Sequence, residues 1–238
     1  MSVEAQERSA TRKAWGIHVF TATGAVCGLL GLLSVLDGSP RAAMLWLMGA
    51  LVIDGIDGPM ARRVDVRLHV PNVDGNVLDL VIDYVTCVVA PAVFLHRFDM
   101  LPRGGALLGS GLVMVTALYC FSRVDLMTDD HYFNGFPAMW GLVVNVLWVL
   151  KSRPMVNMVV IVVLSAMTFT SVKFPHPIRV RDHRNVTMPV VVVWLLVMVL
   201  LTIGYPSSTL AADMIEIGGA AYLVWLAVVR TRRDTQRA

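Results

Sequence analysis

Long apolar runs separated by short polar segments make up most of this chain. At 1.5 Å of rise per residue, such runs are typical of helices that cross about 30 Å of hydrocarbon. Gly and Pro in the first connection, residues 37–41, indicate a tight turn between neighbouring helices. We predict about eight transmembrane helices, at residues 14–36, 42–63, 75–95, 104–122, 136–150, 155–172, 187–204 and 210–229.

The composition supports a membrane protein. Of the 238 residues, 56% are hydrophobic and the mean hydropathy is +0.67, which is too apolar for an ordinary soluble domain. Charged residues make up 16% and the net charge is +3, so nucleic acid is not indicated as a partner. No domain boundary is visible. We expect an all-α, polytopic membrane bundle that forms a single domain over residues 1–238.

The distribution of Lys and Arg predicts the orientation. Fifteen of these residues lie on the side of the N-terminus and five on the other side, and basic residues favour the cytoplasmic side. Both termini are therefore expected in the cytoplasm. The polar segment at residues 63–74, between the second and third helices, should lie on the same side.

Four carboxylates stand out because they lie within or at the ends of apolar helices. Asp54 and Asp57 are three residues apart, and Asp79 and Asp83 are four apart, so each pair projects from one face of its helix. A bare charge in such a place is costly. Carboxylate oxygens suit hard cations such as Mg²⁺ or Mn²⁺, whereas Zn²⁺ usually takes Cys or His. We predict a divalent metal site.

The residues around these carboxylates resemble a known signature. The pattern D-x-x-D-G-x-x-A-R followed by G-x-x-x-D-x-x-x-D is similar to that of the CDP-alcohol phosphotransferases. Its eight fixed positions here are Asp54, Asp57, Gly58, Ala61, Arg62, Gly75, Asp79 and Asp83. Residues 63–74 form a longer insertion than the family usually has. This insertion, with residues 130–140 and 174–184, resembles the bacterial branch that makes phosphatidylcholine.

The resemblance implies a reaction and the residues that perform it. A phosphatidyl group would pass from CDP-diacylglycerol to choline, giving phosphatidylcholine and CMP. Asp54, Asp57 and Asp79 would be metal ligands, with Asp83 as the general base and a further ligand. The cofactor would be two Mn²⁺ or Mg²⁺ ions. The protein would lie in the bacterial inner membrane with its active site facing the cytoplasm, and dimerisation is common among such enzymes.

Substrate contacts follow from the same resemblance and from chemistry. Gly58, Ala61 and Arg62 would bind the CDP-lipid, although small residues also serve helix packing and Arg62 could instead fix the topology. Arg179 and Arg181 could hold the diphosphate, or bind anionic headgroups. Aromatic faces attract quaternary ammonium groups. The candidates for choline are Tyr84, Tyr132, Phe136 and Trp140.

Other interpretations remain open at this stage. The acceptor could be serine, inositol or a polyol phosphate. A cation transporter would also carry Asp residues inside the membrane, but all four here lie towards one face. An inactive family member is a third alternative. Six His residues are scattered without the spacing of metal ligands, and His18, in the first helix, is a candidate for mutation.

Overall fold

The computed structural model describes residues 3–128, 132–176 and 184–235, and most of them are helical. The chain divides into two compact units, Met1–Ala90 and Pro91–Ala238. Within these described residues, five helices are long and apolar enough to cross a membrane, at residues 6–36, 40–64, 75–97, 184–204 and 210–234. Three apolar helices are shorter. The chain is thus an all-α membrane protein.

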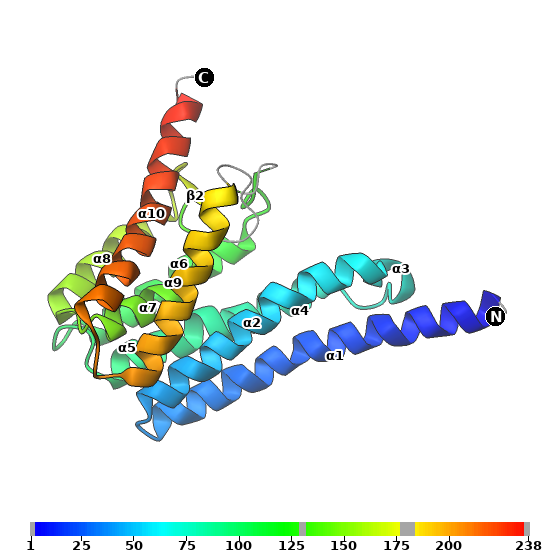
Figure 1. Ribbon diagram of the computed structural model, residues 1–238, viewed down its shortest axis with the longest axis horizontal. Coiled ribbons are helices and arrows are strands. Elements are labelled where there is room, and N and C mark those ends of the chain that lie inside the picture. The colour runs from blue at the N-terminus through cyan, green and yellow to red at the C-terminus, as the bar shows by residue number, and fades with distance from the viewer. Residues whose placement is uncertain (1–2, 129–131, 177–183, 236–238) are drawn as a thin grey trace. The chain divides into compact units, whose positions relative to one another are not determined.

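The first unit is built from three long helical segments and one short helix. They are α1 (Val3–Leu36), α2 (Pro40–Val64), α3 (Val66–His69), and α4 (Gly75–Asp83) with the π-helix η1 (Tyr84–Val89) that continues it. Figure 1 shows α1 and α2 as an antiparallel pair, with α3 at the end of α2 far from their connecting turn. Gly38 takes a positive φ of 71° in that turn, and Pro40 begins α2, where its missing N–H costs nothing.

Glycines on α1 let the three long segments of the first unit approach closely. A Cβ on Gly24 would lie 3.0 Å from Ile82 of α4, and one on Gly28 would lie 3.0 Å from Thr86 of η1. On the α2 side, a Cβ on Gly31 would lie 3.1 Å from Leu47. Helix α1 therefore packs against both α2 and the α4–η1 segment.

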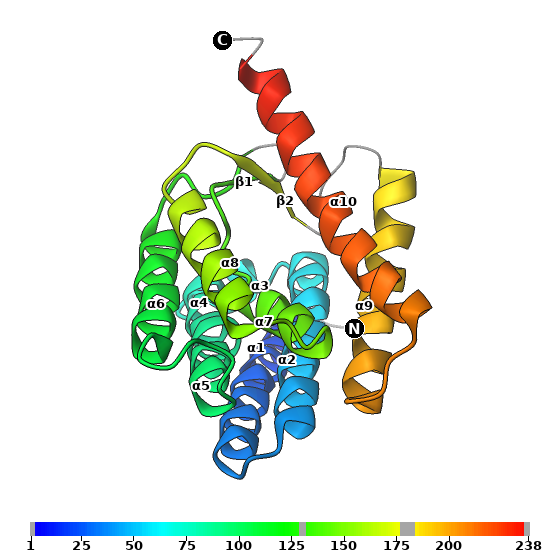
Figure 2. The same cartoon turned by 90° about the vertical axis from the view of Figure 1, so that its left-hand side faces the viewer.

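The second unit contains the remaining helices and a small sheet. They are α6 (Ala106–Ser122), β1 (Tyr132–Asn134), α7 (Trp140–Val149), α8 (Pro154–Met167), β2 (Lys173–Pro175), α9 (Arg184–Gly204) and α10 (Leu210–Thr235), with α5 (Ala90–Arg97) leading into the unit. The two strands pair antiparallel, with Phe133 opposite Phe174. Figure 2 shows this ribbon beside α10, where Lys173 N–H donates to Thr231 Oγ1 at 2.8 Å.

Two of the predicted helices are shorter than expected. The fifth begins at Trp140, not at residue 136, because Pro137 disfavours helical backbone in the residue before it and Ala138 has a φ of 55°. The sixth ends at Met167 instead of residue 172, and its 14 residues span about 21 Å. Thr168, Thr170 and Ser171 then lead into β2, a strand that the sequence pattern did not predict.

Candidate metal centre

Three of the four predicted carboxylates come together in the first unit. Asp54 and Asp57 of α2 and Asp79 of α4 each offer an oxygen, and these oxygens all lie within 4.8 Å of one another. Asp57 is buried, with 6% of its surface exposed, and the other two are partly buried. Oxygen donors at this spacing fit a hard divalent cation, and the cluster contains no Cys or His that would favour a softer metal.

The insertion at residues 63–74 connects α2 to α4 and packs against α1. Asp65 ends α2 with a left-handed φ of 50°, and α3 follows directly. Val66 and Val70 pack into a small core with Ala14 and Ile17 of α1. Burial of these apolar side chains stabilises the packing of the insertion on α1.

A side-chain cap starts the helix that carries Asp79. The carboxylate Oδ1 of Asp74 accepts hydrogen bonds from the backbone N–H of Asn76 at 2.9 Å and of Val77 at 3.4 Å. Such a cap is worth about 1 kcal/mol. It defines where α4 begins, and thereby the turn of helix on which Asp79 stands.

Asp83 is the last residue of α4 and stands one turn after Asp79. The helix then widens into η1, and Thr86 Oγ1 donates to the carbonyl oxygen of Ile82 at 3.0 Å. Single π-helical turns in longer helices are frequent at functional sites. Asp83 is partly buried next to this irregular turn, and Tyr84, a predicted acceptor residue, is the first residue of η1.

The other predicted contacts for the CDP-lipid lie in different surroundings. Gly58 is partly buried, one residue after Asp57, while Ala61 packs against the apolar core formed by α1 and α3. Arg62 is exposed on the last turn of α2. Arg179 and Arg181 lie outside the described residues.

The remaining aromatic candidates form a cluster inside the second unit. Phe136 and Trp140 meet at 4.8 Å between ring centroids, and Phe174 of β2 contacts Phe136 at 5.7 Å. The guanidinium of Arg230 lies 5.5 Å from the ring centroid of Tyr132. Tyr132, Phe136 and Trp140 are all buried. In this structure the Tyr132 ring already faces a cation of the chain itself.

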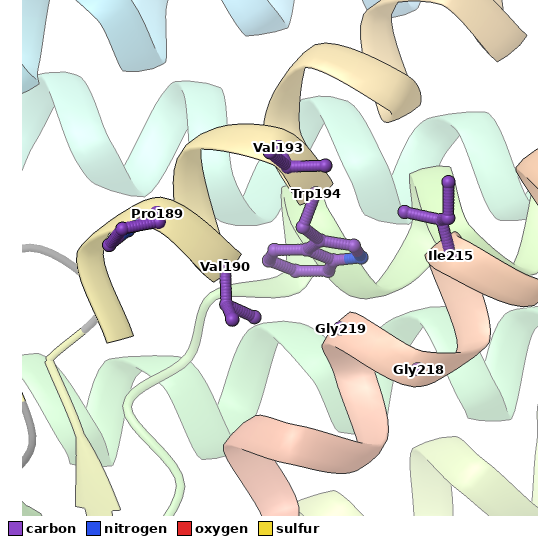
Figure 3. Close-up of a pocket in the computed structure, with 7 residues that line it drawn as sticks. All are labelled: Pro189, Val190, Val193, Trp194, Ile215, Gly218 and Gly219. Atoms are coloured by element: carbon purple, nitrogen blue, oxygen red, sulfur yellow. The ribbon is translucent and has the colours of Figure 1, made fainter. Parts of the chain in front are cut away.

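An apolar pocket of about 380 Å³ lies elsewhere in the second unit, between α9 and α10 (Figure 3). Trp194 of α9 and Gly219 of α10 are among the residues that line it. Its lining contains no titratable side chain, so it offers no group for acid–base or metal chemistry.

Two features of the first unit were not predicted, the break in hydrogen bonding at Pro59 and the burial of His18, a residue that the sequence had already marked for mutation. Pro59 lies inside α2, two residues after Asp57, and its missing N–H frees a backbone carbonyl one turn earlier. His18 of α1 is buried, and its Cε1 lies 3.4 Å from the position of a Cβ on Gly75. A Pro within an apolar helix, and a His on the buried stripe of α1, were the available signals.

The structure is a helical membrane protein, and three of its carboxylates cluster between two helices. Both features agree with the class of protein that the signature predicts, the CDP-alcohol phosphotransferases. No model of a known protein family matches the chain. Curated relatives do match: the phosphatidylcholine synthase of Pseudomonas aeruginosa is 41% identical over 93% of both chains. The phosphatidylcholine synthase of Agrobacterium fabrum is 35% identical over 76% of both chains, and that of Borreliella burgdorferi is 29% identical over 94% of this chain and 97% of its own.

The chain therefore belongs to the phosphatidylcholine synthase family. The family predicted from the signature is confirmed, as is the prediction of an enzyme, a transferase of phospholipid synthesis.

Proposed function

We propose that this enzyme transfers the phosphatidyl group of CDP-diacylglycerol to choline, giving phosphatidylcholine and CMP. The observation that carries the proposal is the grouping of Asp54, Asp57 and Asp79 in a chain related to phosphatidylcholine synthases. The choline oxygen bonds to the lipid-side phosphorus as the phosphoanhydride bond breaks. CMP takes the electron pair of that bond, and the hydroxyl proton passes to Asp83.

In this proposal the four carboxylates have two roles, metal binding and proton transfer. Asp54, Asp57 and Asp79 would hold Mn²⁺ or Mg²⁺. Asp83 would be a ligand of a second ion and is also the base that takes the proton. When bound, the ions neutralise the charge that develops on the phosphate oxygens. Asp83 suits the role of base because it stands one turn along α4 from Asp79, on the same face.

Substrate contacts are assigned around this centre. Gly58 leaves room for the nucleotide beside Asp57, and Ala61 keeps the end of α2 close to α1. Exposed Arg62 pairs with the diphosphate as a charge-assisted donor. Arg179 and Arg181 are proposed as further diphosphate ligands on the basis of the resemblance alone.

For the acceptor, Tyr84 is the best-supported candidate because it follows Asp83 directly and is only partly buried. Tyr132, Phe136 and Trp140 are proposed as a second aromatic group for the ammonium. Because all three are buried, choline could reach their ring faces only after a local rearrangement. A substitution at Tyr84 should therefore change the KM for choline more than one at Trp140.

The surroundings of the enzyme are part of the proposal. We place the whole chain, as one domain, in the bacterial inner membrane with both termini and the carboxylates on the cytoplasmic side, where CMP can leave. The three shorter apolar helices would bring the number of membrane helices to eight. Association as a homodimer is proposed from the resemblance.

One experiment tests the reaction. The purified full-length protein in detergent is given CDP-diacylglycerol, Mn²⁺ and a panel of alcohols, and CMP release is followed. We expect release that depends on choline and is lost in Asp83→Asn. Asp37→Asn, at an exposed carboxylate in the turn between α1 and α2, is the matched control and should keep full activity. CMP release with serine or inositol, and not with choline, would assign a different acceptor alcohol to the enzyme. Cation flux without any CMP release would overturn the proposal.

A further inference from the structure

The side chain of His18 is an unexplained polar group in the first unit. Only 7% of its surface is exposed, and its Nε2 has no hydrogen-bond partner among the residues that the structure describes. A buried ring nitrogen without a partner is unfavourable, because it has lost its water and gained nothing in return. Such a group calls for a ligand.

Contacts between α1 and the α4–η1 segment show where His18 stands. Gly28 faces Thr86, and Gly24, one turn earlier, faces Ile82, so the two helices run parallel and in register. One turn nearer the N-terminus of each helix, Thr21 on α1 is therefore at the same height as Asp79 on α4. A second turn reaches His18, which indeed lies against Gly75.

Contacts between α1 and α2 place His18 at the same height along the helices. These helices are antiparallel, and Gly24 also approaches Ile53 at 3.9 Å. Near the other end of α2, Ala61 packs on the core that contains Ile17 and Ala14. Residues 54–58 of α2 therefore lie opposite residues 18–23 of α1. His18 is at the end of this stretch towards Gly58, one turn from the level of the carboxylate cluster.

This position separates His18 from the acceptor side of the site. Asp83 stands one turn beyond Asp79, towards the apolar interior of the helices, whereas His18 stands one turn before it, towards the polar segment that carries Arg8, Arg12 and Lys13. The diacylglycerol of the donor extends into hydrocarbon, so its nucleotide must point the other way. A nucleotide offers phosphate oxygens and a cytosine amino group as partners for a ring nitrogen, and the ammonium of choline offers none.

We infer that His18 is a substrate-binding residue whose Nε2 forms a hydrogen bond with the cytidine monophosphate part of CDP-diacylglycerol. The inference rests on the proposed function for the identity of the donor. It accounts for the buried, unpartnered nitrogen and for the position of His18 against Gly75, a residue of the signature.

The test measures the affinity of CMP for the purified full-length protein with Mn²⁺ present, together with the KM values of both substrates. His18→Phe keeps a ring of similar volume and removes the nitrogen, and His18→Gln restores a polar group near the position of Nε2. His96→Phe is the matched control, at an exposed His on α5.

We expect His18→Phe to weaken CMP binding about tenfold and to raise the KM for CDP-diacylglycerol by a similar factor, with the KM for choline unchanged and the thermal midpoint no lower than that of the wild type. His18→Gln should recover part of the affinity, and His96→Phe should match the wild type. Equal CMP affinity in His18→Phe and the wild type would overturn the inference and leave the proposed reaction intact. Weakened CMP binding in a protein that uses another acceptor would support the inference while the choline assignment failed.

Discussion

A Cβ placed on Gly24 of α1 would lie 3.0 Å from Cγ2 of Ile82 on α4, which is closer than side-chain contacts normally allow. Ile82 itself is buried, and it stands between Asp79 and Asp83 along the helix. The position of both carboxylates therefore depends on the absence of a side chain at Gly24. The glycine serves a close approach here, a use that is common between membrane helices.

Replacing this glycine by a large residue should displace Asp79 and Asp83 on α4. We expect Gly24→Leu to destabilise the protein by about 1–3 kcal/mol through overpacking and to lower CMP release at least about tenfold. Gly16→Leu is the control on the same helix, because a Cβ there meets nothing within 4 Å. The measurements are the thermal midpoint and the rate of CMP release of the two variants. Equal losses in both would show that the effect is not specific to the contact with Ile82.

Two adjacent glycines on α10 offer a second matched pair. A Cβ on Gly219 would lie 2.4 Å from Cδ1 of Trp194, whereas one on Gly218 would meet nothing within 4 Å. Figure 3 shows Trp194 beside Gly219. The indole Nε1 also donates to the main-chain oxygen of Glu216 at 3.1 Å, so a shift of the ring would weaken that bond as well.

We therefore expect Gly219→Ala to lower the free energy of unfolding by about 1–3 kcal/mol. Gly218→Ala should raise it by about 0.5–1 kcal/mol, because alanine favours helix more than glycine does. Denaturation followed by near-ultraviolet circular dichroism, which reports the Trp environment, distinguishes the two. A neutral Gly219→Ala would mean that α9 and α10 can separate at this point without cost.

The sequence predicted the grouping of Asp54, Asp57 and Asp79 because the spacing of carboxylates on a helix determines which side chains share a face. Asp54 and Asp57 needed only helical geometry, and Asp79 needed an α4 that begins near Gly75, a start that Asp74 indicates as a cap. The start of α7 at Trp140 and the end of α8 at Met167 were less predictable. Apolar residues continue past both points, so hydropathy extended the helices where the backbone turns into loop and strand.

Tertiary contacts decided the features that the sequence did not reveal. The burial of His18 depends on the close approach of α1 to α4, and the π-helical turn after Asp83 lies against Gly28 of α1. The pairing of β1 with β2 joins segments that are about 40 residues apart. A pattern of local periodicity contains none of this information, because each contact joins residues far apart in the chain.

An ion pair beside β1 should give the protein a small dependence of stability on pH. Nε and Nη2 of Arg123 donate to the carboxylate of Asp125 at 2.9 and 2.7 Å, and these hydrogen bonds lower the pKa of Asp125. A lowered pKa in the folded state means that the stabilisation is present above the ordinary pKa of Asp and is lost as the pH falls through the lowered value.

Asp125→Asn should therefore lower the thermal midpoint slightly at neutral pH and not at acidic pH, where the wild type has lost the same interaction. The contribution is small because Asp125 is exposed, with 66% of its side chain accessible. The measurement is the difference in midpoint between variant and wild type across the pH range. A difference that stays constant with pH would show that the ion pair is not its source.

Divalent metal should stabilise the wild type and fail to stabilise Asp57→Asn. Without metal, three carboxylates within 4.8 Å repel one another, so Asp57→Asn should be at least as stable as the wild type. Saturating Mn²⁺ should reverse that order, since a ligand at a hundredfold excess over its Kd stabilises the native state by about 2.7 kcal/mol. Thermal unfolding with Mn²⁺ and with a chelator measures both conditions, and Asp37→Asn should behave like the wild type. Equal stabilisation of Asp57→Asn and the wild type by Mn²⁺ would place the metal elsewhere, because the removed carboxylate is the most buried member of the cluster.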